Sequence, residues 1–157
     1  MPKKRKTKKK EPEKESYTIE VEDWKVDYHF GINTVSEDII PGVYLEWVRL
    51  ILTGRILSPD IEKAGSARIE LSQDPQMDDH WTVRPTIISA KAIGWMEIPR
   101  GDNMLIFCCS IPSRSFAYIP LAVSAGKVKY ASISGTKLKW RKGVVFDVSL
   151  STIREEG

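Results

Sequence analysis

Hydrophobic and polar residues alternate along much of this chain, which is the pattern of β-strands with one buried face. The alternation covers residues 17–21, breaks at residues 22–23 and resumes over residues 24–30. It returns over residues 67–71 and again over residues 144–150. Each strand of a half-exposed antiparallel sheet needs one apolar and one polar face. Several short strands of this kind predict a mainly β fold, either an antiparallel β-sandwich or a partly open barrel.

Residues 43–57 depart from this alternation, because they are apolar on both faces after Val48. Such a run fits either a helix that ends at Gly54 or a long, buried strand. Its β-branched residues and its exit through Ser58-Pro59 favour the strand.

Residues 113–126 predict the one short helix of the fold. Ser113 or Ser115 is placed to cap it, and Gly126 suits its C-terminal end. Pro120 is compatible with a helix only in the first turn.

The first sixteen residues differ sharply in composition from the rest. They hold eight lysines and arginines, three glutamates and, beyond Met1, no hydrophobic side chain. The remaining chain carries 16 basic and 18 acidic residues and is therefore close to neutral. Since a segment without apolar side chains cannot offset the entropy lost on ordering, we expect a disordered tail over residues 1–16 and one globular domain over residues 17–157.

Two features bear on the environment of the protein. Cys108 and Cys109 are adjacent and point to opposite faces of a strand, so they favour a reducing compartment without disulfides. No apolar stretch of bilayer length is present, and none follows the basic N-terminus. We expect a cytoplasmic protein (nuclear in a eukaryote) that does not contact membranes.

Cations in the tail are the strongest chemical signal. Positive charges on a flexible arm can reach phosphates in many geometries. Three interpretations stay open: a solubilising tail without a specific partner, an arm that binds nucleic acid or another polyanion, and a nuclear import signal. The candidate polyanion-binding residues of the tail are Lys3, Lys4, Arg5, Lys6, Lys8, Lys9 and Lys10.

A second basic region lies between Asp102 and Asp147, where the chain holds no acidic residue. A hairpin of residues 127–133 and 136–141 around Ser134-Gly135 would turn its cations to solvent and bury Leu138 and Trp140. That arrangement leaves no aromatic ring on which bases could stack, so we favour the interpretation that lysines protect a strand edge. The candidate polyanion-binding residues of this hairpin are Lys127, Lys129, Lys137, Lys139 and Arg141.

Catalytic and metal-binding patterns are weak. The 74–80 segment lacks the glycine and closing glutamate of a calcium loop, and the two histidines, His29 and His80, have no zinc-site spacing. No nucleophile elbow, phosphate loop or dinucleotide fingerprint occurs. We therefore predict no metal and no cofactor, and favour a non-enzymatic protein. A small-ligand or catalytic barrel with a site built from loops is the alternative, with Asp78, Asp79, His80 and Arg100 as its candidate residues.

Five tryptophans are many for 157 residues. Some are expected in the core, and a surplus of aromatic side chains often anchors an interface. The sequence thus predicts a β-rich binding or assembly module that contacts nucleic acid or another polyanion through its basic residues. Association with a protein partner or a second copy, and a role as structural subunit of a larger assembly, stay open.

Overall fold

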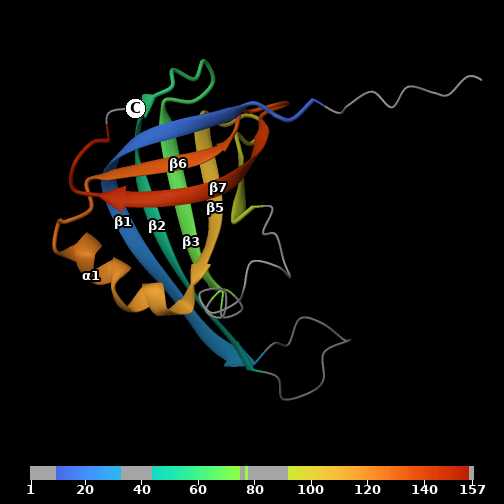
Figure 1. Ribbon diagram of the computed structural model, residues 1–157. Helices are drawn as coiled ribbons and strands as arrows, with labels where there is room; N and C mark the ends of the chain where they lie inside the picture. Colours follow the sequence, from blue (N-terminus) through green and yellow to red (C-terminus); the bar gives the residue numbers. More distant parts are fainter. Residues whose placement is uncertain (1–9, 33–43, 75–76, 78–91, 156–157) are drawn as a thin grey trace, which may run out of the picture.

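The computed structural model describes residues 10–32, 44–74, 77 and 92–155. In this part of the chain seven strands form a closed barrel, and two short helices lie at one end of it (Figure 1). The predicted mainly β fold with one short α-helix is confirmed, and the barrel is closed rather than partly open. The elements are β1 (Lys14–Ile32), β2 (Tyr44–Ser58), β3 (Ser66–Asp74), β4 (Gly94–Glu97), β5 (Met104–Pro112), the 3-10 helix η2 (Ser113–Ala117), α1 (Ile119–Ser124), β6 (Tyr130–Thr136) and β7 (Lys142–Ser151).

Around the barrel the strands follow the order β1-β2-β3-β5-β4-β7-β6, and β6 pairs again with β1. Neighbouring strands are antiparallel except β3 and β5, which run parallel from Ser66 opposite Met104 to Asp74 opposite Pro112. This pair departs from the predicted antiparallel sheet. Alternation within a strand reports its buried face but not the direction of its neighbour, so the sequence pattern could not predict it.

The break in alternation at residues 22–23 is a β-bulge inside one long strand. The register of β1 against β2 shifts between Val21 and Asp23, so that beyond the shift the even-numbered Trp24 and Val26 lie opposite Leu52 and Leu50. Gly54 lies opposite the bulge, where an added Cβ would clash with the Glu20 carbonyl oxygen. Bulge and glycine together let the two strands approach closely and coil around the barrel.

The two segments that depart from the alternation fold as a strand and a helix. Residues 44–58 form β2, which confirms the strand interpretation. In α1, Pro120 lies in the first turn, and Gly126 beyond its end has φ of 68°, both as predicted. The serine cap was wrong, because residues 113–117 already wind as η2 and leave Tyr118 at the α1 N-cap without a side-chain hydrogen bond.

Inward-facing side chains of all seven strands fill the barrel. Burial alternates strictly along β5 and over the first part of β3, as the two-residue period predicts. Tyr17 and Phe107 pack edge to face, with ring centroids 5.5 Å apart. None of the described helices is long and apolar enough to cross a membrane. The largest fully buried side chains are Tyr17, Phe107, Ile19, Leu50, Ile51, Leu52, Ile69, Leu71, Met96, Leu105, Ile133 and Val145.

The two ends of the barrel differ in construction. At one end, called the turn end here, lie the start of β1 and the connections 59–65, 98–103 and 137–141. At the other, called the helix end, lie η2, α1 and the end of β7 (Figure 1). β1 starts at Lys14 and pairs with β6 from there on, so residues 14–16 of the expected tail belong to the barrel.

Candidate nucleic-acid interface

The connection between β6 and β7, residues 137–141, ends in a two-residue turn with Trp140 and Arg141 at its tip. The Lys139 N–H donates to the Lys142 carbonyl oxygen (2.9 Å), and the Lys142 N–H donates to the Lys139 carbonyl oxygen (3.1 Å). Both tip residues have positive φ, 54° and 68°, as a type I′ hairpin turn requires. A side chain other than glycine adopts this backbone at a cost of about 1–2 kcal/mol, so other contacts must hold the turn.

Arg141 supplies those contacts. Its Nε donates to the Ile98 carbonyl oxygen at 2.9 Å. Its Nη2 donates to the carbonyl oxygens of Pro99 (2.9 Å) and Asp102 (3.1 Å). The Ile98 N–H in turn donates to the Arg141 carbonyl oxygen at 2.9 Å. These bonds fix the turn to the 98–103 connection, so the guanidinium of this predicted polyanion-binding residue is directed at backbone oxygens.

Trp140, by contrast, points into solvent and is 88% exposed. The prediction that it lies inside with Leu138 was wrong. Leu138 does pack against the core, but β6 ends at Thr136, and the left-handed backbone at the turn directs the indole ring outwards. An exposed aromatic ring on a fixed turn is a surface on which a nucleic-acid base can stack.

Three exposed lysines flank Trp140 in the sequence. Lys139 is exposed, and the side chains of Lys137 and Lys142 are 63% and 76% exposed. Lys137 Nζ lies 3.6 Å from Glu13 and Lys142 Nζ lies 4.0 Å from Glu97. Exposed ion pairs of this kind contribute little free energy, so the ammonium groups can exchange these partners for phosphates.

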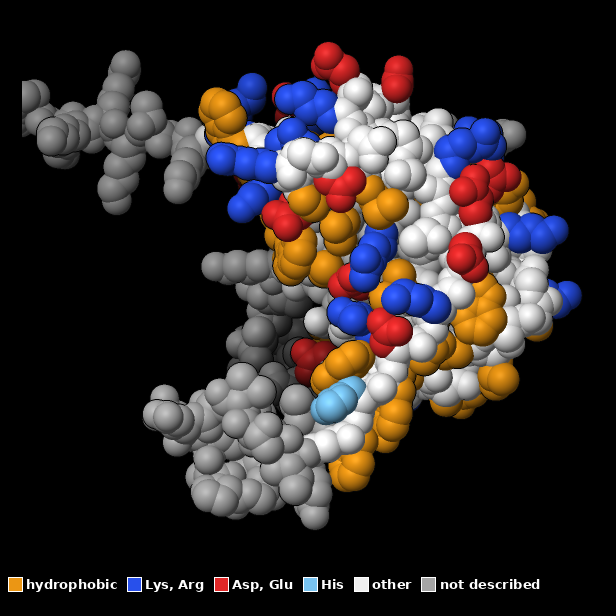
Figure 2. Space-filling model, turned by 180° about the vertical axis from the view of Figure 1, so that it is seen from behind, with side chains coloured by type: hydrophobic (Ala, Val, Ile, Leu, Met, Phe, Trp, Pro, Cys, Tyr) orange, Lys and Arg blue, Asp and Glu red, His pale blue; other side chains and the backbone are white. Residues whose placement is uncertain are grey.

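The start of the described chain lies beside this turn. The Lys137 N–H donates to the Glu13 carbonyl oxygen at 2.7 Å, and Lys10 is exposed. In Figure 2, blue side chains gather at the end of the barrel where the described chain begins. The other predicted tail residues, Lys3, Lys4, Arg5, Lys6, Lys8 and Lys9, lie outside the described residues.

A cavity of about 670 Å³ adjoins the turn. Lys137, Trp140 and Arg100 line one part of it, and the 59–63 connection lines another. Tyr17 also lines it and donates its hydroxyl to the Thr136 carbonyl oxygen (3.1 Å); burial raises the pKa of this phenol. The lining carries charges of both signs, from Glu15, Asp60 and Glu62 and from Lys63, Arg100, Lys137 and Arg141.

Lys127 and Lys129 lie elsewhere, and the predicted hairpin was wrong. Ser134 and Gly135 lie within β6, not in a turn. Lys127 and Lys129 precede β6 at the helix end, where the Lys129 N–H donates to the Ser151 carbonyl oxygen. The length of β6, about 20 Å, separates them from Lys137, so the five cations do not share one face. The hairpin turn lies at Trp140-Arg141 and not at Ser134-Gly135, because Arg141 binds the 98–103 connection there.

Of the other candidate residues the structure describes Arg100 and His29. Arg100 lines the cavity at the turn end, whereas Asp78, Asp79 and His80 lie outside the described residues. His29 stacks on Trp47 with ring centroids 5.6 Å apart. The residues that the structure describes hold no group of three or more histidine, cysteine or acidic side chains placed to bind a metal.

Both cysteines are poor nucleophiles at neutral pH. Cys109 is buried and Cys108 is half-buried on β5. Burial raises the pKa of each thiol to about 12, and the nearby Glu70 carboxylate adds to the effect at Cys108. Since the thiolate is the reactive form, both thiols have low reactivity in this environment.

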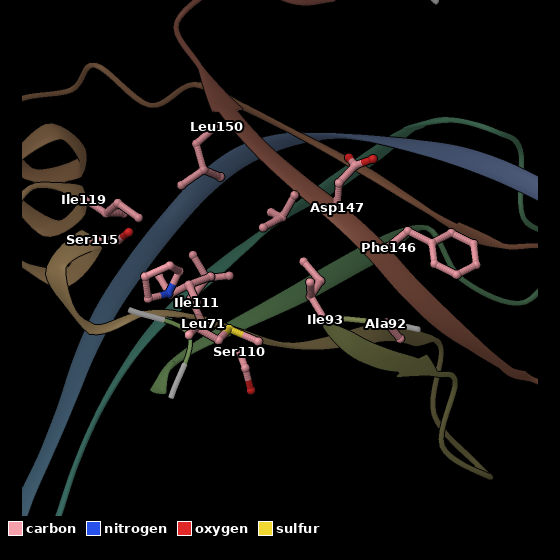
Figure 3. A pocket seen from close by; sticks show the side chains of 13 residues that line it. Leu71, Ala92, Ile93, Ser110, Ile111, Ser115, Ile119, Phe146, Asp147 and Leu150 are labelled. Atoms are coloured by element: carbon pink, nitrogen blue, oxygen red, sulfur yellow. The ribbon is translucent and has the colours of Figure 1, made fainter. Parts of the chain in front are cut away.

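A second cavity of about 790 Å³ opens near the helix end (Figure 3). It lies where the short strand β4 no longer separates β5 from β7: the last backbone bonds there are those of Ile93, whose N–H donates to the Val145 carbonyl oxygen and whose carbonyl oxygen accepts from the Ser110 N–H. Beyond that point Ile111 and Leu150 line the space with Ile119 of α1. Ser115 and Asp147 are among the polar residues of this mostly apolar lining (Figure 3).

Sequence reasoning missed the exposed ring of Trp140 and the contribution of Lys142. The run Lys137-Leu-Lys-Trp-Arg-Lys142 carries the signal, because it interleaves four cations with one aromatic residue. Its turn lacks the Asn-Gly or Asp-Gly pair typical of type I′, and for that reason the local pattern favours a strand.

No family model, curated protein or solved structure matches this chain.

Proposed function

We propose that this protein binds single-stranded nucleic acid at the turn end of its barrel. The observation that carries the proposal is the 88% exposure of Trp140 on a turn that also holds Lys137, Lys139 and Lys142. The ring would stack on one base while the ammonium groups contact the flanking phosphates. Bases of a duplex are already stacked on each other, so a single exposed ring favours unpaired strands.

The tail extends this site. Residues 3–10 contain seven cations, and the chain enters the barrel beside the turn through the backbone bond between Glu13 and Lys137. A strand held at the turn would therefore lie within reach of the tail, which would follow its phosphates without reading sequence. We infer a non-catalytic role. The side chains at this turn, cations and one aromatic ring, suit binding, and the thiols elsewhere are weakly reactive.

The test is fluorescence anisotropy with a labelled oligothymidylate and with a duplex of the same length, using the full chain. We expect tighter binding to the single strand and a loss of about fivefold or more in affinity on Trp140→Ala, the value of one base stacked on an aromatic side chain. Tyr118→Ala is the matched control, because Tyr118 is 72% exposed but lies between η2 and α1. Equal binding by wild type and Trp140→Ala, or no binding by wild type, would contradict the proposal.

The apolar cavity in Figure 3 favours a second candidate function, the binding of a small apolar molecule. Val148 and Leu150 of β7 belong to its lining, and a cavity of a few hundred Å³ with few polar groups suits such a ligand. Titration with a fluorescent long-chain fatty acid tests this candidate. Saturable binding that is lost on Val148→Phe, which fills the cavity, would support it, and absence of saturable binding would exclude that ligand class.

A further inference from the structure

The long hairpin of β1 and β2 has an uncovered edge. β1 pairs with β2 over residues 18–32 but with β6 only over residues 14–20, and the Val21 N–H still donates to the Lys129 carbonyl oxygen (2.8 Å). From Glu22 onwards no described strand pairs with the outer edge of β1. Alternate residues of a strand direct their N–H and C=O groups to each edge, so between Glu22 and His29 this edge carries backbone groups that no described strand pairs with. The Trp24 N–H donates to Asp23 Oδ1 at 2.8 Å.

Side chains along this edge are largely apolar and aromatic, as at an interface, whereas a protected edge carries lysine or proline. Trp24 and Val26 are each 41% exposed and Tyr28 is 62% exposed, all on one face of β1. Figure 2 shows orange side chains along this hairpin, beside the pale blue imidazole. Proteins usually protect such edges with lysines or proline, yet residues 22–31 contain one lysine and no proline.

The opposite face carries charges of alternating sign on Asp23, Lys25 and Asp27. Lys25 Nζ lies 3.6 Å from Asp27 Oδ2 of the same strand, and the two side chains are 61% and 30% exposed. If two copies of this edge pair antiparallel about Val26, each Lys25 lies opposite Asp27 of the other copy. In the same register Asp23 lies opposite His29.

The same charges exclude the neighbouring registers. Centring the pair on Lys25 would set Lys25 against itself and Asp23 against Asp27. Centring it on Asp27 would set Asp27 against itself. Like charges directly opposite each other destabilise a strand pair, so charge specifies the register centred on Val26.

In that register the apolar face is also complementary. Trp24 would lie opposite Tyr28 at two equivalent places, and Val26 opposite itself. Aromatic and β-branched cross-strand pairs of this kind stabilise sheets. On the charged face, Arg49 Nη2 lies 3.2 Å from Asp27 Oδ2 and the Arg49 guanidinium lies over the Trp47 ring. These contacts hold β1 against β2 and preorganise the edge.

We propose that this chain forms a symmetric dimer by antiparallel pairing of residues 23–29 of β1 with the same residues of a second copy. The two hairpins would then form one continuous sheet with a two-fold axis at Val26. The turn ends, which lie at the opposite end of each barrel from this hairpin, would point away from each other. A dimer would thus offer two separate copies of the Trp140 turn to one long strand.

The mass of the full chain in solution, measured by sedimentation equilibrium, tests the dimer. We expect a mass of two copies for wild type. Lys25→Glu and Asp27→Lys should each weaken the dimer about tenfold or more, because each places like charges opposite at two symmetric positions. Mixing the two variants should restore a dimer, since every introduced charge then meets an opposite one.

A second measurement fixes the register. In Val26→Cys, the introduced thiols would face each other across the two-fold axis, at a Cα separation of about 5 Å, and mild oxidation should yield a covalent dimer. Tyr118→Cys, exposed away from the edge, is the matched control and should stay monomeric on a denaturing gel. A monomeric wild type, a dimer unaffected by both charge variants, or a mixture that does not re-associate would overturn the proposal.

Discussion

Trp140 and Arg141 are adjacent at the tip of one turn, and their side chains have opposite environments. The indole ring is 88% exposed, while the guanidinium of Arg141 donates three hydrogen bonds to carbonyl oxygens of the 98–103 connection. Both residues have a left-handed backbone. Arg141 therefore anchors the turn, and Trp140 beside it stays exposed to solvent. Folding by itself does not require an exposed indole ring at this position.

If the Trp140 ring serves binding and not folding, a residue better suited to its left-handed backbone should raise the free energy of unfolding. Trp140→Asn removes no buried contact and places a residue that tolerates positive φ at the turn. We expect the free energy of unfolding to rise by about 0.5–1 kcal/mol, while affinity for the oligothymidylate falls. Urea denaturation followed by circular dichroism measures the first effect. A variant that unfolds more easily than wild type would show that the exposed ring has a structural role.

Arg141 should behave in the opposite way. Arg141→Ala leaves the carbonyl oxygens of Ile98, Pro99 and Asp102 without their donor and keeps a side chain at positive φ. We expect the free energy of unfolding to fall by about 2–3 kcal/mol, as when hydrogen bonds to a charged group are removed. Arg141→Lys should recover little of it, because an ammonium group cannot reproduce the planar geometry of the guanidinium. Unchanged stability in both variants would refute the anchoring role.

Close approach of β4 and β5 makes a glycine necessary at the start of β4. A Cβ added at Gly94 would clash with the Cys108 carbonyl oxygen, so Gly94→Ala must push the strands apart. We expect a loss of about 3 kcal/mol or more in stability. Gly65→Ala is the matched control, since its Cβ would meet nothing within 4 Å, and it should change stability by less than about 0.5 kcal/mol.

The two thiols predict a pH dependence of stability. Their pKa values are raised from 9.0 to about 12 in the fold, so between these values the unfolded chain releases protons that the folded chain retains. Stability due to the neutral thiols is complete below pH 9 and decreases as the pH rises towards 12. Denaturation at pH 8 and pH 10.5 should show this decrease, and the Cys108→Ser/Cys109→Ala double variant should show a smaller one. Equal decreases would rule out the thiols as its source.

Much of the fold could be predicted from local pattern. The alternation marks the buried face of β3 and of β1 as far as Ile19, and Pro120 and Gly126 mark the limits of α1, because strand period and helix-end chemistry are local properties. In β7 the predicted face was wrong: Val145 is buried, whereas Val144 and Phe146 are 38% and 36% exposed, because the pairing of β6 with β7 shifts register there. The parallel pairing of β3 with β5 and the closure of the barrel depend on contacts far apart in the sequence, which alternation does not encode.

The candidate site was predicted in part. Its lysines were identified from composition, but their placement depends on where β6 ends. The chain turns at Trp140 because Arg141 reaches the 98–103 connection, a tertiary contact that overrides the weak turn propensity of both residues. The same contact separates Lys137 from Lys127 and turns the ring outwards.

The salt dependence of binding tests the central claim most directly. For single strands, the slope of log affinity against log salt concentration changes by about 0.7 for each phosphate that the protein ceases to neutralise. Replacing Lys137, Lys139 and Lys142 together by glutamine should therefore make the slope shallower by about 2. Replacing Lys127 and Lys129, the exposed lysines of the helix end, should leave it unchanged. Equal slopes for wild type and the turn variant, or a change confined to the helix-end variant, would contradict a nucleic-acid interface at the Trp140 turn.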